Sequence, residues 1–266
     1  MTEPAPLTIA VFQCAARDEP ATARLERLDA AAARAAAAGA RLLVTPEAYL
    51  SGYGGMPDTV QARAEPADGP SARRAAEIAR RHGLAIVLGY PEAAEGVVYN
   101  AALCLGPDGS VLANHRKLGL SGAAEQATYA RGGAPTGFEL DGHRIAVLIC
   151  YDLEFPELAR SAALAGATVL VAPTALVERW PLVAHKMIPT RAFENGTYVA
   201  YANWAGSEPG YRYLGASCIA GPTGEDLARA GDDEALLTAV VDPDAITAAR
   251  ATLPYLQDCR TLPTGS

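Results

Sequence analysis

The chain has 266 residues, half of them apolar and a fifth charged, so it is long and apolar enough to fold around a sizeable core. Its 30 acidic residues outnumber its 22 basic residues, and the formal net charge of −8 argues against nucleic acid or an anionic membrane surface as a partner. Because no internal repeat or low-complexity linker interrupts it, the sequence predicts a single domain over residues 1–266.

The cysteines and histidines indicate a reduced protein without a metal. The five cysteines are odd in number and widely spaced, and they form no CxxC pair or metal-like cluster with the four histidines. Residues 1–6 lack the features of a secretory signal, and no run of about 18 apolar residues offers a membrane span. We therefore expect a cytoplasmic protein with no cofactor, no metal and no membrane partner.

In the first half of the chain, predicted strands alternate with predicted helices. The strands are short apolar runs at residues 7–14, 42–45, 84–90, 97–105 and 110–114. The Gly-Pro-Asp-Gly stretch at 106–109 predicts a hairpin between the last two. Helices are predicted at 21–38 and 71–81, each followed by a glycine signal.

The second half continues this alternation after a polar segment at 117–133, which is predicted to be a loop or a short helix. Strands are predicted at 143–149, 168–172, 197–203, 213–220 and 236–241. Helices are predicted at 156–165, 181–195 and 243–250, and the remainder is predicted to be a tail. Strands that are apolar on both faces need helices over the sheet, so the pattern predicts an α/β fold.

Three residues whose side chains could take part in catalysis stand at the edges of these apolar strands. Glu47 and Lys117 each come shortly after a predicted strand, in the kind of loop where α/β proteins place reactive groups. Cys150 stands where a buried strand meets a helix, and a helix N-terminus favours a thiolate. Taken singly, Glu47 and Lys117 read better as solvated turn residues, and Cys150 as a nucleophile or a buried inert thiol with equal weight.

Taken together and in this order, the three residues resemble the Glu-Lys-Cys triad of the nitrilase (carbon–nitrogen hydrolase) superfamily. The glutamate motif occupies 46–53, the lysine motif 116–117 and the cysteine motif Cys-Tyr-Asp-Leu-Glu-Phe-Pro-Glu 150–157. Further matches lie at 173–175, 191–195, 201–203, 215–217 and 221–224, so the resemblance covers nearly the whole chain. It implies the superfamily's four-layer α-β-β-α sandwich, which usually dimerises through helices, and therefore a homodimer or higher homo-oligomer.

The resemblance also implies roles for the three residues and for a fourth. Cys150 would be the nucleophile and Glu47 the general base, while Lys117 would stabilise the oxyanion with the backbone N–H of Tyr151. Glu125, eight residues after Lys117, matches the family's second glutamate, which positions the substrate and the lysine. Asp152 and Glu154 read best as structural residues, although Glu154 could instead face a cationic substrate.

Other residues fall in segments that line the family's substrate pocket. They are Tyr49, Tyr53, Tyr151, Thr174, Glu178 and Trp204, of which Glu178 could attract an ammonium or guanidinium end. Within the superfamily the chain most resembles the short bacterial aliphatic amidases typified by 5-aminopentanamidase. Gly119 and Ser121 stand where histidine and phenylalanine are common, so the departures concern the pocket wall rather than the triad.

The leading hypothesis is an amidase that releases ammonia from a small aliphatic carboxamide, including ω-amino and ω-guanidino amides, through a thioester acyl-enzyme. A second hypothesis keeps the triad but assigns a nitrile or an N-carbamoyl (ureido) substrate. Tyr151-Asp152 after the cysteine favours the amide, since nitrilases usually carry Trp-Glu there. A third hypothesis is a catalytically inactive binding subunit, against which the complete triad counts.

Overall fold

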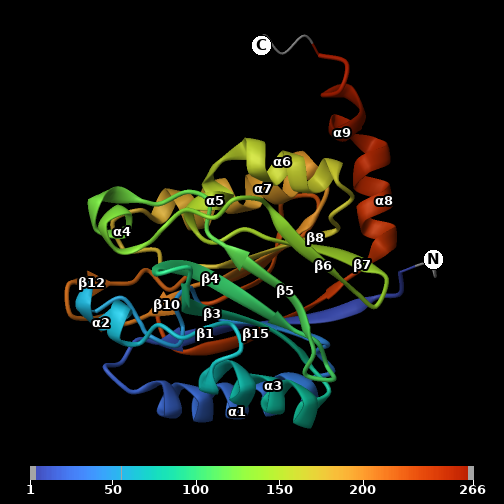
Figure 1. Cartoon of the computed structure of the whole chain (residues 1–266). Coiled ribbons are helices and arrows are strands. Elements are labelled where there is room, and N and C mark those ends of the chain that lie inside the picture. The colour runs from blue at the N-terminus through green and yellow to red at the C-terminus, as the bar shows by residue number, and fades with distance from the viewer. Residues whose placement is uncertain (1–3, 55, 263–266) are drawn as a thin grey trace.

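Two β-sheets lie face to face in the molecule, and helices cover the outer face of each sheet (Figure 1). This computed structural model describes residues 4–54 and 56–262. The four layers are those of the α-β-β-α sandwich that the resemblance implied. The mixed order of parallel and antiparallel strands also agrees with the α/β class expected from the sequence.

The first sheet runs β10-β1-β2-β3-β4-β5, with β15 also paired to β1. Its strands are β1 (Leu7–Ala15), β2 (Leu42–Val44), β3 (Ala85–Ala94), β4 (Val97–Leu105), β5 (Val111–Arg116), β10 (Trp204–Ala205) and β15 (Ala235–Val241). Helices α1 (Ala21–Ala37) and α3 (Pro70–His82) cover its outer face (Figure 1). Alanine-rich sequence favours α1, and α3 ends at Gly83, whose left-handed conformation suits glycine.

The second sheet runs β14-β13-β9-β8-β7-β6. Its strands are β6 (Thr136–Leu140), β7 (His143–Val147), β8 (Val169–Pro173), β9 (Tyr198–Ala202), β13 (Cys218–Ala220) and β14 (Asp226–Arg229). Helices α6 (Pro156–Leu164) and α7 (Ile188–Asn195) cover its outer face. The remaining elements are α2 (Asp58–Ala62), α4 (Gly122–Thr128), α5 (Tyr151–Glu154), the π-helix η1 (Val183–Met187), α8 (Pro243–Thr252), α9 (Tyr255–Asp258) and the hairpin β11 (Ser207–Glu208) with β12 (Tyr211–Arg212).

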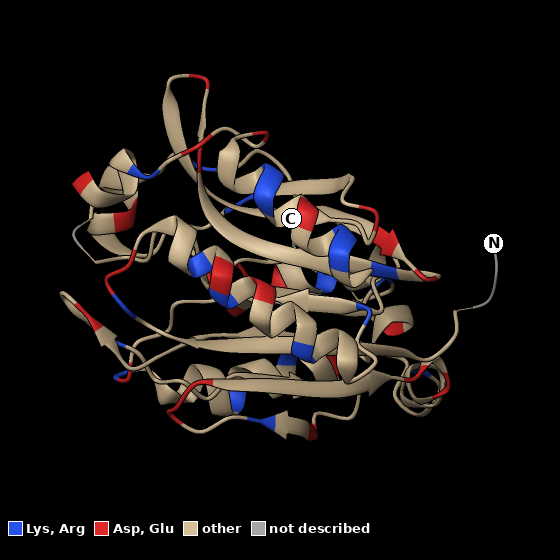
Figure 2. Cartoon of the chain, turned by 90° about the horizontal axis from the view of Figure 1, so that it is seen from below, with Lys and Arg blue, Asp and Glu red and all other residues tan. Residues whose placement is uncertain are grey.

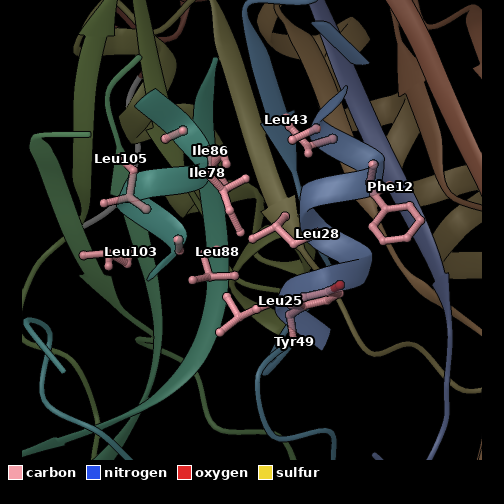
Figure 3. Packing of buried hydrophobic residues seen from close by; sticks show 14 of the residues in the cluster. Phe12, Leu25, Leu28, Leu43, Tyr49, Ile78, Ile86, Leu88, Leu103 and Leu105 are labelled. Carbon is pink, nitrogen blue, oxygen red and sulfur yellow. The ribbon is translucent and has the colours of Figure 1, made fainter. Parts of the chain in front are cut away.

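Three buried apolar clusters fill the three interfaces between these layers. Leu28 and Ile78 pack on Leu88 between the outer helices and the first sheet, as Figure 3 shows. Val44 and Val171 belong to the cluster between the two sheets. The third cluster lies between the second sheet and its helices. Burial of this apolar surface, at about 25 cal/mol per Å², holds the layers together.

Several elements differ from the sequence prediction. Residues 213–220 contain a strand only at the end of that range (β13), and the helix expected at 181–195 is divided between η1 and α7. The expected tail contains α9, and α2, β6, β14 and the β11–β12 hairpin were not predicted. These missed elements are short or half-exposed, so they carry too few apolar residues to give a periodic signal.

Basic and acidic positions are interspersed along the ribbon in Figure 2. None of the helices in residues 4–54 and 56–262 is both long and apolar enough to cross a membrane.

The strand order places candidate catalytic residues from both sheets at the carboxyl ends of parallel strands. Strands β1, β2 and β3 are mutually parallel, as are β7, β8 and β9 in the other sheet. Carboxyl ends of parallel strands are where α/β folds place their sites. Glu47 follows β2 and Cys150 follows β7, so each sheet contributes one of the two.

Candidate active site

Glu47 is fixed by groups from both sheets. Its backbone N–H donates to the carbonyl of Thr174 at 3.2 Å, just beyond β8, and its carbonyl accepts from the indole N–H of Trp204 at 2.9 Å. Glu47 as a whole is only 1% exposed. Burial raises the pKa of Glu47, with the cation of Lys117 acting in the opposite direction.

Lys117 lies between two carboxylates. Its Nζ donates to Oε1 of Glu47 at 2.6 Å and to Oε1 and Oε2 of Glu125 at 2.7 and 3.0 Å. Burial alone would lower the pKa of Lys117, but the two carboxylates outweigh it and raise the pKa well above its ordinary value. The two carboxylates therefore favour the charged form of Lys117 and hold its ammonium in place.

Cys150 occupies a sharp turn between β7 and α5. Its φ of 46° lies in the left-handed region, which is strained for a residue other than glycine, and its N–H donates to the carbonyl of Pro173 at 2.9 Å. Such strand-to-helix turns raise a nucleophile above its surroundings. Burial raises the pKa of the thiol well above its ordinary value, the nearby Glu47 adds to the rise and Lys117 opposes it. The thiol therefore needs a base to become a nucleophile.

The carboxylates of Glu47 and Glu125, the ammonium of Lys117 and the thiol of Cys150 line one cavity of about 530 Å³. Tyr53 and Tyr151, two of the residues expected to contact substrate, also line it. Ser121, Glu154 and Arg179 line it as well. A cavity of this size that combines convergent polar groups with apolar side chains suits a small organic molecule. Its apolar wall includes Met56, Leu176, Val177, Trp180 and Val183.

Four residues expected in the pocket wall do not line this cavity. Tyr49 is fully buried behind it, where its hydroxyl donates to the carbonyl of Arg24 and its ring stacks on Trp204. Trp204 is committed to Glu47 through its indole N–H, and the hydroxyl of Thr174 donates to its own strand at Ala172. These three therefore support the wall from behind rather than form it.

Glu178, the fourth, was expected to meet a cationic substrate end, and the structure corrects this. Its side chain is exposed and forms an ion pair with Arg212 at 3.0 Å on the surface. Glu154, which read best as structural, lines the cavity instead. Trp180 also lines the cavity and is exposed.

Sequence reasoning missed Asn100 and Tyr211. Tyr211 reaches the cavity from the unpredicted β11–β12 hairpin and stacks edge-on against Tyr53. Asn100 is completely buried in β4 and donates to Glu47 Oε1 at 2.7 Å and to Tyr53 Oη at 2.9 Å. A signal for Asn100 was present, since it is an amide in the middle of the apolar run 97–105.

The part of the chain that the structure describes contains no group of three or more His, Cys, Asp or Glu side chains that could hold a metal ion.

Comparison with known proteins identifies the family. A family model described as carbon-nitrogen hydrolase matches residues 8–251. A Pseudomonas protegens protein named "Hydrolase in pqqF 5'region" is 44% identical over 256 residues, which is 96% of this chain and 89% of the relative. An (R)-stereoselective amidase of a Pseudomonas species is 33% identical over 260 residues, 97% of this chain and 93% of the relative.

Among solved structures, the NitN amidase of Nesterenkonia sp. AN1 superposes with a TM-score of 0.84 at 36% identity, covering 96% of this chain and 97% of that one. A variant of the amidase from the same organism in complex with butyramide gives a TM-score of 0.80 at 34% identity, with 93% and 95% covered. The chain belongs to the carbon–nitrogen hydrolase family and, by these likenesses, to the nitrilase superfamily. It is an enzyme that hydrolyses amides.

Proposed function

We propose that this amidase releases ammonia from small aliphatic carboxamides through a thioester on Cys150. The observation that carries the proposal is the convergence of the thiol of Cys150, the carboxylate of Glu47 and the ammonium of Lys117 on one cavity. A small amide is also the ligand named for a solved relative, the Nesterenkonia amidase bound to butyramide.

In the first half of the reaction, Glu47 takes the proton of Cys150 and the thiolate attacks the amide carbonyl carbon. Lys117 and the backbone N–H of Tyr151, for which no hydrogen bond is found among the described residues, stabilise the oxyanion. The C–N bond then breaks, and Glu47 returns its proton to the leaving nitrogen, which departs as ammonia. The acyl group stays on sulfur as a thioester.

In the second half, Glu47 takes a proton from water as the water oxygen attacks the thioester carbonyl. The tetrahedral adduct expels the Cys150 thiolate, which recovers the proton from Glu47 and leaves a carboxylic acid as product. Glu125 supports both halves because its two oxygens hold the Lys117 ammonium in place. Glu47 therefore acts as base and acid in alternation.

The acidic group that favours an ω-amino or ω-guanidino amide is Glu154. It lies four residues after Cys150, about one helical turn away, and lines the same cavity. Glu47 and Glu125 are already paired with Lys117, whereas no hydrogen bond or ion pair to the half-buried Glu154 carboxylate is found among the described residues. An ammonium or guanidinium on the substrate would supply the missing partner.

We also propose one carbon–nitrogen hydrolase domain, a homodimer and a cytoplasmic location. The family match over residues 8–251 supports the first. Exposed aromatic rings of Phe193 on α7 and Tyr255 on α9, in contact with each other, support a partner on the helical face. All five cysteines are free, which suits a reducing compartment.

The test is ammonia release from 5-aminopentanamide, 4-guanidinobutanamide, butanamide, glutamine, a matched nitrile and a ureido acid, each beside Cys150→Ala. Turnover of amides that disappears in the variant supports the proposal. Turnover of only the nitrile, or of the ureido acid with carbon dioxide, would move the enzyme to another branch. If no substrate releases ammonia and Cys150 does not react with iodoacetamide, the result would favour an inactive binding subunit.

A further inference from the structure

The two oxygens of the Glu47 carboxylate are in different environments. Oε1 accepts two hydrogen bonds, from Lys117 Nζ at 2.6 Å and from Asn100 Nδ2 at 2.7 Å. Oε2 is equally buried but has no hydrogen-bond partner among the described residues. A carboxylate buried in this way has one oxygen occupied by donors and one oxygen free to accept a proton.

Asn100 is fixed in the orientation that this arrangement needs. Its two amide hydrogens go to two acceptors, Oε1 of Glu47 and the hydroxyl oxygen of Tyr53. The Tyr53 hydroxyl donates onward to Glu125 Oε1 at 3.0 Å. A flipped amide would turn its carbonyl oxygen toward the Glu47 carboxylate, so the neighbours select a single orientation.

The backbone of Asn100 also meets the site. Its carbonyl accepts the N–H of Lys117 at 2.8 Å, so one residue of β4 contacts both members of the Glu47–Lys117 pair. The amide oxygen Oδ1 of Asn100 is buried without a partner, which costs stability. Packing alone would be better served by an apolar side chain here, and this points to the two donated hydrogen bonds as the role of the residue.

We propose that Asn100 is a positioning residue for the general base: with Lys117 it occupies Oε1 of Glu47 and leaves Oε2 as the oxygen that takes the proton from Cys150 and then from water. This inference rests on the proposed function, in which Glu47 is the base. Without Asn100 the carboxylate could rotate about its last bond, and either oxygen could then turn toward Lys117 instead of the thiol.

A donor on Oε1 also stabilises the ionised carboxylate, so its removal favours the protonated form of Glu47. The charged and titratable groups that face Glu47 from the surrounding elements are Lys117, Glu125, Tyr53, Tyr129, Cys150, Glu154 and Tyr213. Each of these is retained when Asn100 is changed. The acid limb is the low-pH side of the kcat/KM profile, where activity falls as Glu47 is protonated. A shift of this limb in an Asn100 variant can therefore be assigned to the loss of the amide.

The experiment compares Asn100→Ala and Asn100→Asp with the wild-type enzyme and with Asn114→Ala, which removes an amide from the neighbouring strand β5 that contacts Tyr90 rather than Glu47. For Asn100→Ala we expect kcat/KM to fall about 10- to 100-fold, the effect of losing a hydrogen bond to a charged group, mainly through kcat. The acid limb of kcat/KM should move to higher pH. In Asn100→Asp a second carboxylate faces Glu47, so the limb should move further in the same direction.

The pH dependence of iodoacetamide alkylation of Cys150 gives a second readout that needs no substrate and can be measured even if Asn100→Ala folds poorly, since Asn100→Asp keeps the shape of the side chain. An acid limb and an alkylation profile equal to wild type in both variants would overturn the inference. Glu47→Gln is measured in parallel: full activity in that variant would overturn the proposed base itself. If Glu47→Gln is inactive but the pH profiles of the Asn100 variants equal those of the wild type, only the role of Asn100 is overturned.

Discussion

The carboxylate of Asp152 accepts a hydrogen bond of 2.7 Å from the backbone N–H of Gly119, and it thereby joins the segment after Cys150 to the segment after Lys117. The same carboxylate accepts from the N–H of Leu118 at 3.1 Å and from that of Ile149 at 3.2 Å. It is completely buried, as is the ring of His115 at 3.3 Å. Asp152 therefore fixes the relative positions of the segments that carry Cys150 and Lys117.

Loss of this junction should lower stability and activity together. In Asp152→Ala, the buried N–H of Ile149 and the half-buried N–H groups of Leu118 and Gly119 lose their acceptor, and we expect a decrease of about 2–4 kcal/mol in the free energy of unfolding. Urea unfolding followed by circular dichroism measures it. Asp68→Asn, at an exposed position, is the control and should stay within about 0.5 kcal/mol of wild type. Equal stability of Asp152→Ala and wild type would refute the junction.

Replacement of the nucleophile should abolish turnover without unfolding the chain. Cys150→Ala removes one sulfur atom, and its backbone N–H can still donate to Pro173. Because the mechanism has no second nucleophile, we expect activity to fall by about 10⁴-fold or more with little change in melting temperature. Residual turnover within tenfold of wild type would point to another nucleophile.

The rate should fall on the acidic side at a pH above the ordinary range of a carboxylic acid. Glu47 must be ionised to take the thiol proton, and burial raises its pKa. The rate therefore falls as the pH decreases through that raised pKa and Glu47 becomes protonated. Lys117 should not titrate on this side, because its pKa is raised well above its ordinary value. A pH profile of kcat/KM between pH 4 and 10 provides the check, and a flat acid side would contradict the role of Glu47.

Glu154 should control the preference for charged amides. In Glu154→Gln we expect kcat/KM for 5-aminopentanamide to fall about 3- to 30-fold, since the carboxylate is half-buried and partly screened, while hexanamide is hydrolysed as before. Burial raises the pKa of Glu154, so the preference in the wild-type enzyme should weaken as the pH falls. Glu157→Gln makes the same charge change outside the cavity. Equal losses of kcat/KM for 5-aminopentanamide and hexanamide would show that Glu154 does not recognise the charge of the substrate.

Treatment with a chelator should leave the enzyme unaffected. The proposed chemistry uses a thiol, a carboxylate and an ammonium, and no step needs a Lewis acid. We expect dialysis against EDTA to change ammonia release by less than about twofold. A loss that zinc or magnesium restores would require a different mechanism.

The strand ends could be predicted because they depend on local patterns. Apolar runs followed by Glu47 and Cys150 placed both residues correctly at the ends of buried strands. What lies beside them depends on contacts between distant segments. Trp204 was expected in the pocket wall, but its position on β10, parallel to the end of β1, turns its indole N–H to the back of Glu47. Such contacts come from strand pairing, which one sequence does not contain.

Local geometry also explains why Glu154, rather than Glu178, lines the cavity. The backbone N–H of Glu178 donates to the carbonyl of Arg212, and this pairing directs its carboxylate outward to the guanidinium of the same arginine. Glu154 lies one turn after Cys150 on α5, so it remains on the side of the cavity. The spacing of four residues was visible in the sequence. The length of α5, which makes that spacing meaningful, was not.

Because Glu47 and Lys117 follow strands of one sheet and Cys150 follows a strand of the other, the thickness of the apolar layer between the sheets sets how far apart these residues lie. A side chain made larger or smaller at Val44 or Val171 would change the separation of base and nucleophile before it unfolded the protein. In the proposed mechanism the interior of this sandwich thus works as a spacer, and its packing sets the distance over which the proton passes from Cys150 to Glu47.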